Sequence, residues 1–117
     1  MRENVVKGKS FEFALRIVKL YKYLCENKKE YVLSKQVLRS GTAIGALVRE
    51  AEQAESKADF IHKMLIALKE ANETDYWLDL LSQSDYISKK NYESIQKDIH
   101  EILKLLISIV KTSKSNR

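Results

Sequence analysis

Glu70, Glu73 and Trp77 lie three and four residues apart and are the densest group of chemically active side chains in the sequence. Such spacing places side chains on one face of a helix, where two carboxylates could perform acid–base catalysis. No nucleophile, oxyanion site or substrate cleft is indicated beside them, so we expect no enzyme. A carboxylate near an apolar face is costly without a partner, and the pattern therefore predicts an ion-pair network, buried or at an interface. Its possible cations are Arg39, Arg49 and Lys69.

Metal and thiol chemistry have little support in the sequence. Di-iron bundles use Glu-x-x-His pairs, whereas here Asp59 precedes His62 and Lys97 precedes His100. The second pair lacks a carboxylate, so we expect no metal centre and no cofactor. The single Cys25 excludes an internal disulfide and a multi-cysteine zinc site, and it is typical of a small apolar side chain in a reducing cytoplasm.

Basic side chains offer a different chemistry, the binding of phosphate. The net charge is +5, and residues 1–30 and 88–117 each contribute +4, whereas residues 59–87 contribute −4. A positive side formed by the two ends of the chain would suit nucleic-acid phosphates, although the same pattern is also typical of a solvated helix surface. The candidate phosphate contacts are Arg16, Lys19, Lys22, Lys97 and Lys104.

Aromatic side chains could add stacking to such phosphate contacts, because bases stack on aromatic rings with little sequence preference. Trp77 and most of the six tyrosines lie on or beside apolar stripes, where core packing is the simpler interpretation. Tyr23 and Tyr86 are the most free of these stripes.

The least expected feature of the second predicted helix is Gly41-x-x-x-Gly45. Each glycine costs about 1 kcal/mol relative to alanine inside a helix, so a compensating contact is expected. Small residues at this spacing let another backbone approach closely. Both helix packing within the bundle and a subunit interface fit this pattern.

The elements that must position these residues are helices. With no proline and only three glycines, the chain excludes a β-sandwich or barrel, and it has no glycine-rich dinucleotide loop. Apolar residues recur at steps of three and four in four segments, which predicts four helices. The first ten residues lack the apolar run of a secretory signal and no segment is apolar enough to span a membrane, so we expect a cytoplasmic protein with no membrane partner.

Capping residues locate the helix boundaries. Ser10 is predicted to cap the first helix, Ser56 with Asp59 has capping-box spacing for the third, and Ser88 is predicted to cap the fourth. Short links force neighbouring helices to be antiparallel, so we predict an all-α, up-down-up-down four-helix bundle of one domain. The other boundaries are a second helix over 31–54, connections at 26–29 and 82–85, a core over about 10–110 and a polar tail at 111–117 that we expect to fray.

Two stretches carry a pattern that resembles a known family. Residues 36–51 contain the run Arg-Ser-Gly-Thr, and residues 56–78 contain Lys-Glu-Ala-Asn-Glu-Thr-Asp-Tyr-Trp. Both resemble the bacterial four-helix bundle family named after the 23S rRNA intervening-sequence protein, and the likeness extends from about residue 10 to 110. Ala43 and Leu47 stand where the family usually has serine and asparagine, so no polar role is expected of them.

The resemblance implies an antiparallel bundle that assembles as a homopentamer without enzymatic activity. Some members are encoded within intervening sequences of the large-subunit rRNA gene. A related branch, the accessory variability determinant of diversity-generating retroelements, implies nucleic acid and a reverse transcriptase as partners. A ring needs two different patches that meet, and one acidic and two basic helices would supply them.

We therefore expect a non-catalytic, cytoplasmic oligomer that binds RNA or DNA phosphates through the first and fourth helices. The alternative is a protein-interaction scaffold that recruits a partner such as a polymerase or reverse transcriptase through the aromatic and acidic third helix. An enzyme would rest on Glu70, Glu73 and His62.

Overall fold

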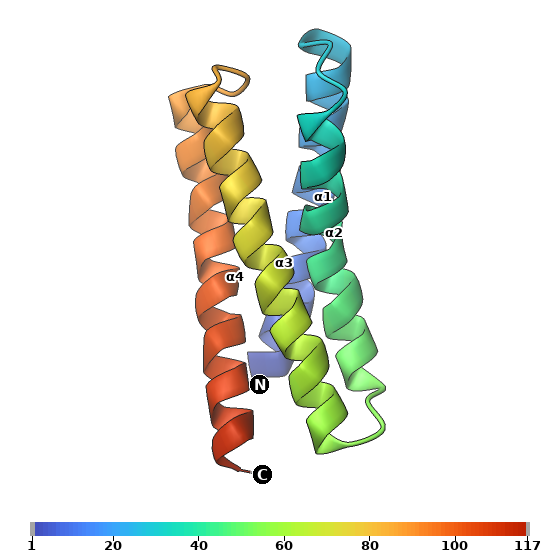
Figure 1. The fold of residues 1–117 in the computed structure, drawn as a ribbon. Helices are drawn as coiled ribbons and strands as arrows, with labels where there is room; N and C mark the ends of the chain where they lie inside the picture. Colours follow the sequence, from blue (N-terminus) through green and yellow to red (C-terminus); the bar gives the residue numbers. More distant parts are fainter. Residues whose placement is uncertain (1, 117) are drawn as a thin grey trace.

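The computed structural model describes residues 2–116, which form four α-helices joined by short links (Figure 1). The helices are α1 (Arg2–Asn27), α2 (Leu33–Glu52), α3 (Lys57–Gln83) and α4 (Lys89–Ser115). Both ends of the chain lie at the same end of the bundle (Figure 1). The expected all-α class is confirmed.

Side-chain pairs between the helices show their relative direction. Arg39 of α2 contacts Glu70 of α3, whereas Glu50 contacts Lys63, so residue numbers rise on one helix as they fall on the other. The other neighbours repeat this reversal, with pairs Lys7–Glu52 and Cys25–Ser34 for α1 and α2, Asp75–His100 and Asp79–Tyr92 for α3 and α4, and Lys9–Glu101 and Arg16–Asp98 for α1 and α4. The molecule is an antiparallel up-down-up-down four-helix bundle, as predicted.

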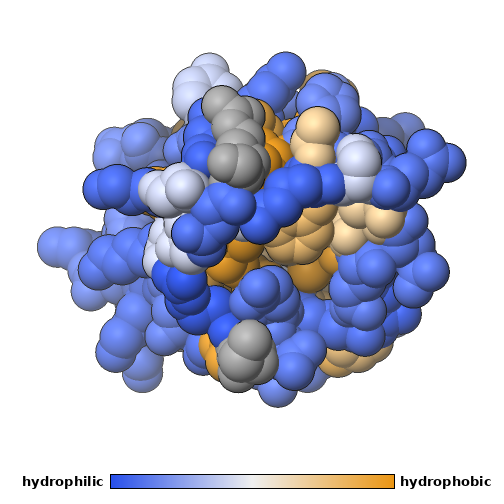
Figure 2. All heavy atoms as spheres, turned by 90° about the horizontal axis from the view of Figure 1, so that it is seen from below, coloured by the Kyte–Doolittle hydropathy of each residue, from blue (hydrophilic) through white to orange (hydrophobic). Residues whose placement is uncertain are grey.

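One continuous apolar core follows the bundle axis. Each helix contributes fully buried residues, among them Ile17, Ile44, Leu78 and Ile99. Seen from the end that holds both termini, hydrophilic residues surround apolar ones near the axis (Figure 2). Within residues 2–116, no helix has the apolar length needed to cross a membrane.

Two of the predicted caps are present. Ser56 accepts a hydrogen bond from the Asp59 amide at 3.0 Å, and Ser88 accepts one from the Asn91 amide at 3.1 Å. The Asp59 carboxylate also accepts from the Glu55 amide at 3.2 Å, one residue before the position that a capping box uses. These local interactions begin α3 and α4 where the sequence predicts.

The predicted start of the first helix at Ser10 is wrong. α1 begins at Arg2, and the buried Ser10 hydroxyl lies 3.2 Å from the Lys7 carbonyl oxygen within the helix. Val6 is fully buried in the core, and Lys7 forms an ion pair with Glu52 of α2 at 2.9 Å. Contacts with the rest of the bundle therefore stabilise the polar first turns.

The polar tail, which was expected to fray from residue 111, is helical up to Ser115. α4 continues through it to Ser115, whereas the last position, residue 117, lies outside the described residues. Arg2 donates hydrogen bonds to Thr112 at 2.9 Å and to Ser108, which links the two ends of the chain. The core also begins before residue 10, because Val6 of α1 is fully buried in it.

α2 covers Leu33–Glu52 and is shorter than the predicted 31–54. At its N-terminal end, Glu30 of the preceding link caps the helix. The Glu30 carboxylate accepts hydrogen bonds from the Val32, Leu33 and Ser34 amides at 3.2, 3.0 and 2.7 Å. Burial acts to raise the pKa of Glu30, but these backbone hydrogen bonds outweigh it and leave the pKa below its ordinary value. The link thus holds a buried negative charge at the positive end of α2.

Candidate nucleic-acid interface

Four lysines spaced seven residues apart follow the exposed side of α4. We call this set the α4 lysine stripe: Lys90, Lys97, Lys104 and Lys111. Seven residues are close to two turns, so the side chains remain on one side of the helix and drift by only about 20° per step. All four are exposed, and within residues 2–116 none of them forms an ion pair. Sequence reasoning found Lys97 and Lys104 and missed the other two, although the same spacing would have identified them.

Arg16 of α1 is not a free cation. Its Nη1 lies 2.8 Å from the Asp98 carboxylate, and its Nη2 donates to the Ser94 hydroxyl at 2.8 Å. Both partners lie on α4, so the guanidinium is held across the boundary between the two helices. Asp98 neutralises much of the charge that the sequence offers at this position.

Lys19 and Lys22 are both exposed but lie on different sides of α1. Lys19 borders a pocket between α1 and α4, to which α4 contributes Asn91 and Ile95. Lys22 is seven residues after Leu15 and eleven after Phe11, which places it on the α1 face that borders α2. The structure therefore places Lys19 on the side of α1 that adjoins α4 and Lys22 on the side that adjoins α2.

A second group of predicted residues meets on the outer side of α2 and α3. Arg39 donates from Nη1 to both Glu70 carboxylate oxygens, at 3.3 and 3.1 Å, and from Nη2 to Glu73. The Trp77 indole donates to the same Glu73 oxygen at 3.0 Å. We call these four residues the Arg39 cluster.

The Arg39 cluster favours the ionised form of Glu73. The hydrogen bond from Trp77 lowers the pKa of Glu73 most, burial opposes it, and Arg39 adds to the lowering. Hydrogen bonds to Glu73 and Glu70 in turn raise the pKa of Arg39. Glu73 thus has a lowered pKa and two donors on one oxygen, which is typical of a structural anion and agrees with the ion-pair interpretation of the sequence.

Arg49 and Lys69, the other cations considered as partners for these carboxylates, lie elsewhere. The Arg49 guanidinium carbon is 5.2 Å from the centre of the Phe11 ring on α1, a cation–π contact. Lys69 is exposed on the outer face of α3. Arg39 alone among the three forms ion pairs with Glu70 and Glu73.

Gly41 and Gly45 face α1 within the same chain. A Cβ atom added to Gly41 would lie 2.8 Å from Cγ1 of Ile17, and one added to Gly45 would lie 3.4 Å from the Ser10 carbonyl oxygen. The two helices therefore approach closely where these small residues lie. Of the two uses considered for the glycines, the structure places them in helix packing.

Sequence reasoning missed one buried polar contact between α2 and α3. The Thr74 hydroxyl lies 2.9 Å from the Ser40 hydroxyl and 2.8 Å from the Glu70 carbonyl oxygen, and both hydroxyl side chains are fully buried. The two residues lie in the Arg-Ser-Gly-Thr and Glu-Thr runs that carry the family resemblance. Their position in those runs was the available signal.

The histidines and the cysteine occupy separate places. His62 is exposed, and Nε2 of His100 lies 3.3 Å from the Asp75 carboxylate on α3. Cys25 is half-buried, with its sulfur 3.8 Å from the Ser34 hydroxyl. Across residues 2–116, the structure gathers no three histidine, cysteine or acidic side chains into a metal-binding group.

These features define an antiparallel four-helix bundle with an unpaired basic stripe on one helix and an ion-pair cluster on the opposite side. The chain matches the family model of the 23S rRNA-intervening sequence protein over residues 2–108 and belongs to this family. The resemblance drawn from residues 36–51 and 56–78 is therefore confirmed.

A solved structure gives the same result. The chain is similar to a protein of unknown function from the S23 ribosomal protein family of Bacteroides thetaiotaomicron, with 66% sequence identity and a TM-score of 0.94. The match covers 95% of this chain and 99% of that one. A comparison with curated proteins gives no match.

Proposed function

We propose that this protein is a non-catalytic, cytoplasmic oligomer that binds nucleic acid through phosphate contacts from α1 and α4. The observation that carries the proposal is the α4 lysine stripe, together with Lys19 on the adjoining side of α1. Exposed, unpaired lysines bind phosphates by releasing condensed counterions, and they lose no protein ion pair in doing so. The engaged carboxylates of the Arg39 cluster support the absence of catalysis.

The geometry of the stripe supports binding to a backbone over reading of bases. Successive lysines are about 10 Å apart along α4, and the four extend over about 31 Å, at 1.5 Å per helical residue. A flexible ammonium group meets phosphate as a point charge and carries no sequence information. We therefore propose discrimination by the shape of the nucleic acid.

The oligomer in this proposal is the homopentamer that the family resemblance implies. One exposed apolar patch supports it: Phe11 and Leu15, one turn apart on α1, are about half exposed. In a ring the contacts are heterologous, so this patch would meet a different surface of the next chain. Five chains of net charge +5 would sum to about +25, a field strong enough to attract a polyanion.

A charge-reversal pair of variants tests the proposal. The first variant combines Lys19→Glu, Lys97→Glu and Lys104→Glu, and the matched control combines Lys35→Glu, Lys57→Glu and Lys69→Glu, three exposed lysines on α2 and α3. Both variants make the same change in net charge. Binding of a labelled DNA duplex and an RNA hairpin is measured across a salt series, with circular dichroism to check folding.

We expect the first variant to bind at least about tenfold more weakly than the control. Its log–log salt dependence on the duplex should be less steep by about 0.9 for each phosphate that the variant no longer neutralises. Equal binding by the two variants would refute a specific basic face. Absence of binding by the unmodified protein at low salt would refute nucleic-acid binding altogether.

A protein scaffold is the second candidate, and one observation favours it. Tyr76 is 60% exposed on α3, and its ring meets the Trp77 ring edge-on at 5.1 Å beside the Arg39 cluster. Aromatic and arginine side chains are enriched where proteins bind each other. If the titration gives no nucleic-acid binding, this surface becomes the leading candidate for recruiting a protein partner such as a polymerase.

A further inference from the structure

Polar contacts join α1 to α4 at every seventh residue of α1. The three contacts link Arg2 to Ser108, Lys9 to Glu101, and Arg16 to Ser94. In each pair the two residue numbers add to 110, which is the register of an antiparallel helix pair. The boundary between the two helices is therefore closed by a polar contact at three levels.

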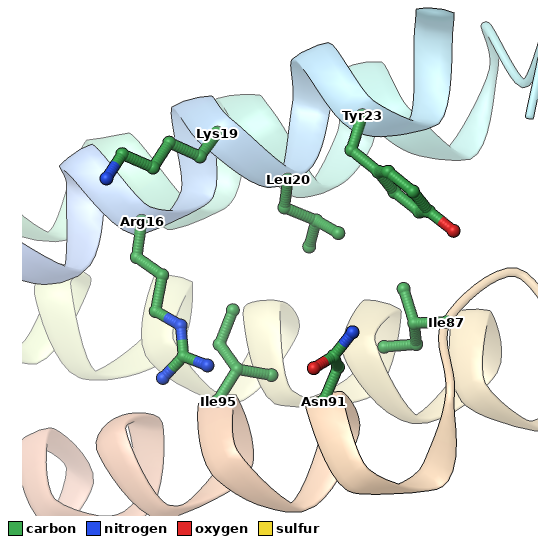
Figure 3. A pocket seen from close by; sticks show the side chains of 7 residues that line it. All are labelled: Arg16, Lys19, Leu20, Tyr23, Ile87, Asn91 and Ile95. Carbon is green, nitrogen blue, oxygen red and sulfur yellow. The ribbon is translucent and has the colours of Figure 1, made fainter. Parts of the chain in front are cut away.

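The fourth level of this boundary is open. The same register places Tyr23 of α1 at the level of Ile87, in the link just before α4, and the apolar Ile87 side chain cannot form a polar contact. A pocket of about 250 Å³ lies here between the helices, and both residues line it (Figure 3). The gap therefore occurs where the repeating polar contact stops.

The pocket has apolar walls and an aromatic end. Leu20, Ile87 and Ile95 line it, and Ile87 and Ile95 are buried. Tyr23 lies at one end and Arg16 at the other (Figure 3), and the Tyr23 side chain is 40% exposed. Sites for drug-sized ligands usually measure about 300–1,000 Å³, so this pocket has room for about one ring.

Polar groups surround the opening. Asn91 is exposed beside the pocket, and among residues 2–116 its carboxamide makes no hydrogen bond, because only its backbone amide is used by the Ser88 cap. Lys19 is exposed and forms no ion pair within the described chain, whereas Arg16 is fixed by Asp98 at 2.8 Å. Among the described residues, the opening thus combines a cation without an ion pair, a cation held by Asp98 and a carboxamide without a hydrogen bond.

We propose that this pocket binds a single unpaired nucleobase from a strand or loop whose phosphates contact α1 and α4; this inference rests on the proposed function. A base has apolar faces, polar edges and an adjoining phosphate, and these match the walls, Asn91 and Lys19 respectively. Tyr23 supplies the stacking surface. Bases of an intact duplex remain stacked inside it, so the pocket selects single-stranded segments.

Two single strands with equal numbers of phosphates separate base binding from phosphate binding. One is a fluorescein-labelled oligothymidylate of about 12 nucleotides, a length typical of single-strand sites, and the other is an abasic strand of the same length. Their affinities are measured at one low salt concentration for the unmodified protein and for Tyr23→Ala, Tyr23→Phe and Asn91→Phe. Tyr76→Ala, which removes an exposed tyrosine on α3, is the matched control.

The unmodified protein should bind oligothymidylate more tightly than the abasic strand. Tyr23→Ala should weaken oligothymidylate binding by about 5- to 150-fold, the range that loss of one stacked base removes, and leave abasic binding unchanged. Tyr23→Phe and Tyr76→Ala should bind both strands as the unmodified protein does, whereas Asn91→Phe, which fills the opening, should resemble Tyr23→Ala. Equal affinity of the unmodified protein for the two strands would overturn the base pocket and leave phosphate binding intact. Failure to bind either strand would overturn both.

Discussion

Gly41 and Gly45 lie one turn apart on α2, yet the space in front of each glycine differs. A Cβ at Gly41 would lie 2.8 Å from the fully buried Ile17 side chain, which has little room to move. A Cβ at Gly45 would meet the nearest atom, in Ser10, at 3.4 Å, an ordinary contact. At Gly41, a steric clash would therefore oppose the higher helix propensity of alanine. At Gly45, almost nothing would oppose it.

Single alanine substitutions at the two glycines should consequently change stability in opposite directions. Gly45→Ala should stabilise the fold by up to about 1 kcal/mol, the gain in helix propensity. Gly41→Ala adds an overpacking cost of about 1–3 kcal/mol and should be destabilising by up to about 2 kcal/mol. Urea unfolding at one fixed protein concentration measures both. A Gly41→Ala protein as stable as Gly45→Ala would contradict this account of the helix contact.

What the sequence predicted of the candidate site depends on how local each signal is. Lys97 and Lys104 were found, because spacing along one helix places a charge without knowledge of other helices. The Asp98 partner of Arg16 depends on the register between α1 and α4, which the sequence does not state. For the same reason Arg49 was considered for the carboxylates of α3, although its contact is Phe11 of α1.

At the scale of helices, the boundaries set by contacts local in sequence were predicted, whereas those set by contacts between helices were not. Ser56 and Ser88 cap their helices through bonds to amides three residues later, and such short-range bonds are readable from sequence. α1 begins at Arg2 because Val6 enters the core and Arg2 reaches α4, contacts that only the assembled bundle provides. Capping of α2 by a glutamate from the preceding link departs from the usual serine, threonine, aspartate and asparagine, and was missed.

Glu30 should make folding stability dependent on pH. Its pKa in the folded protein is lowered, so its contribution is complete above the unfolded pKa of about 4.3 and is lost as pH falls through the lower folded value. Glu30→Gln should therefore reduce the free energy of unfolding at pH 7 by about 1 kcal/mol, the typical effect of losing a cap, and by less near pH 3. Urea unfolding at both pH values checks this. Glu26→Gln, an exposed change at the end of α1, serves as the control, and an equal effect in both proteins would contradict the role of Glu30.

For the whole molecule, the bundle order determines how charge is distributed. α1 and α4 are far apart in sequence but adjacent in space, so the two basic ends of the chain adjoin each other. The acidic third helix turns Glu70 and Glu73 toward Arg39 on the opposite side. A basic side formed by α1 and α4 is thus separated from the exposed apolar residues of α3.

A strong electrostatic field requires assembly, because the net charge of one chain is only +5. We expect light scattering to give a particle of about 68 kDa, five times the chain mass of 13.6 kDa. Leu15→Glu places a charge on the exposed α1 patch and should yield the monomer, because burying an unpaired carboxylate at a subunit interface is costly. Without multivalent binding, the affinity for nucleic acid should then fall by about 10²-fold or more, although every lysine of the α4 stripe is intact.

Val32→Glu, a change at an apolar residue that is 70% exposed in the link before α2, should alter neither mass nor affinity. A Leu15→Glu protein that keeps the full particle mass would place the subunit interface elsewhere, and an unmodified protein of 13.6 kDa would refute the oligomer.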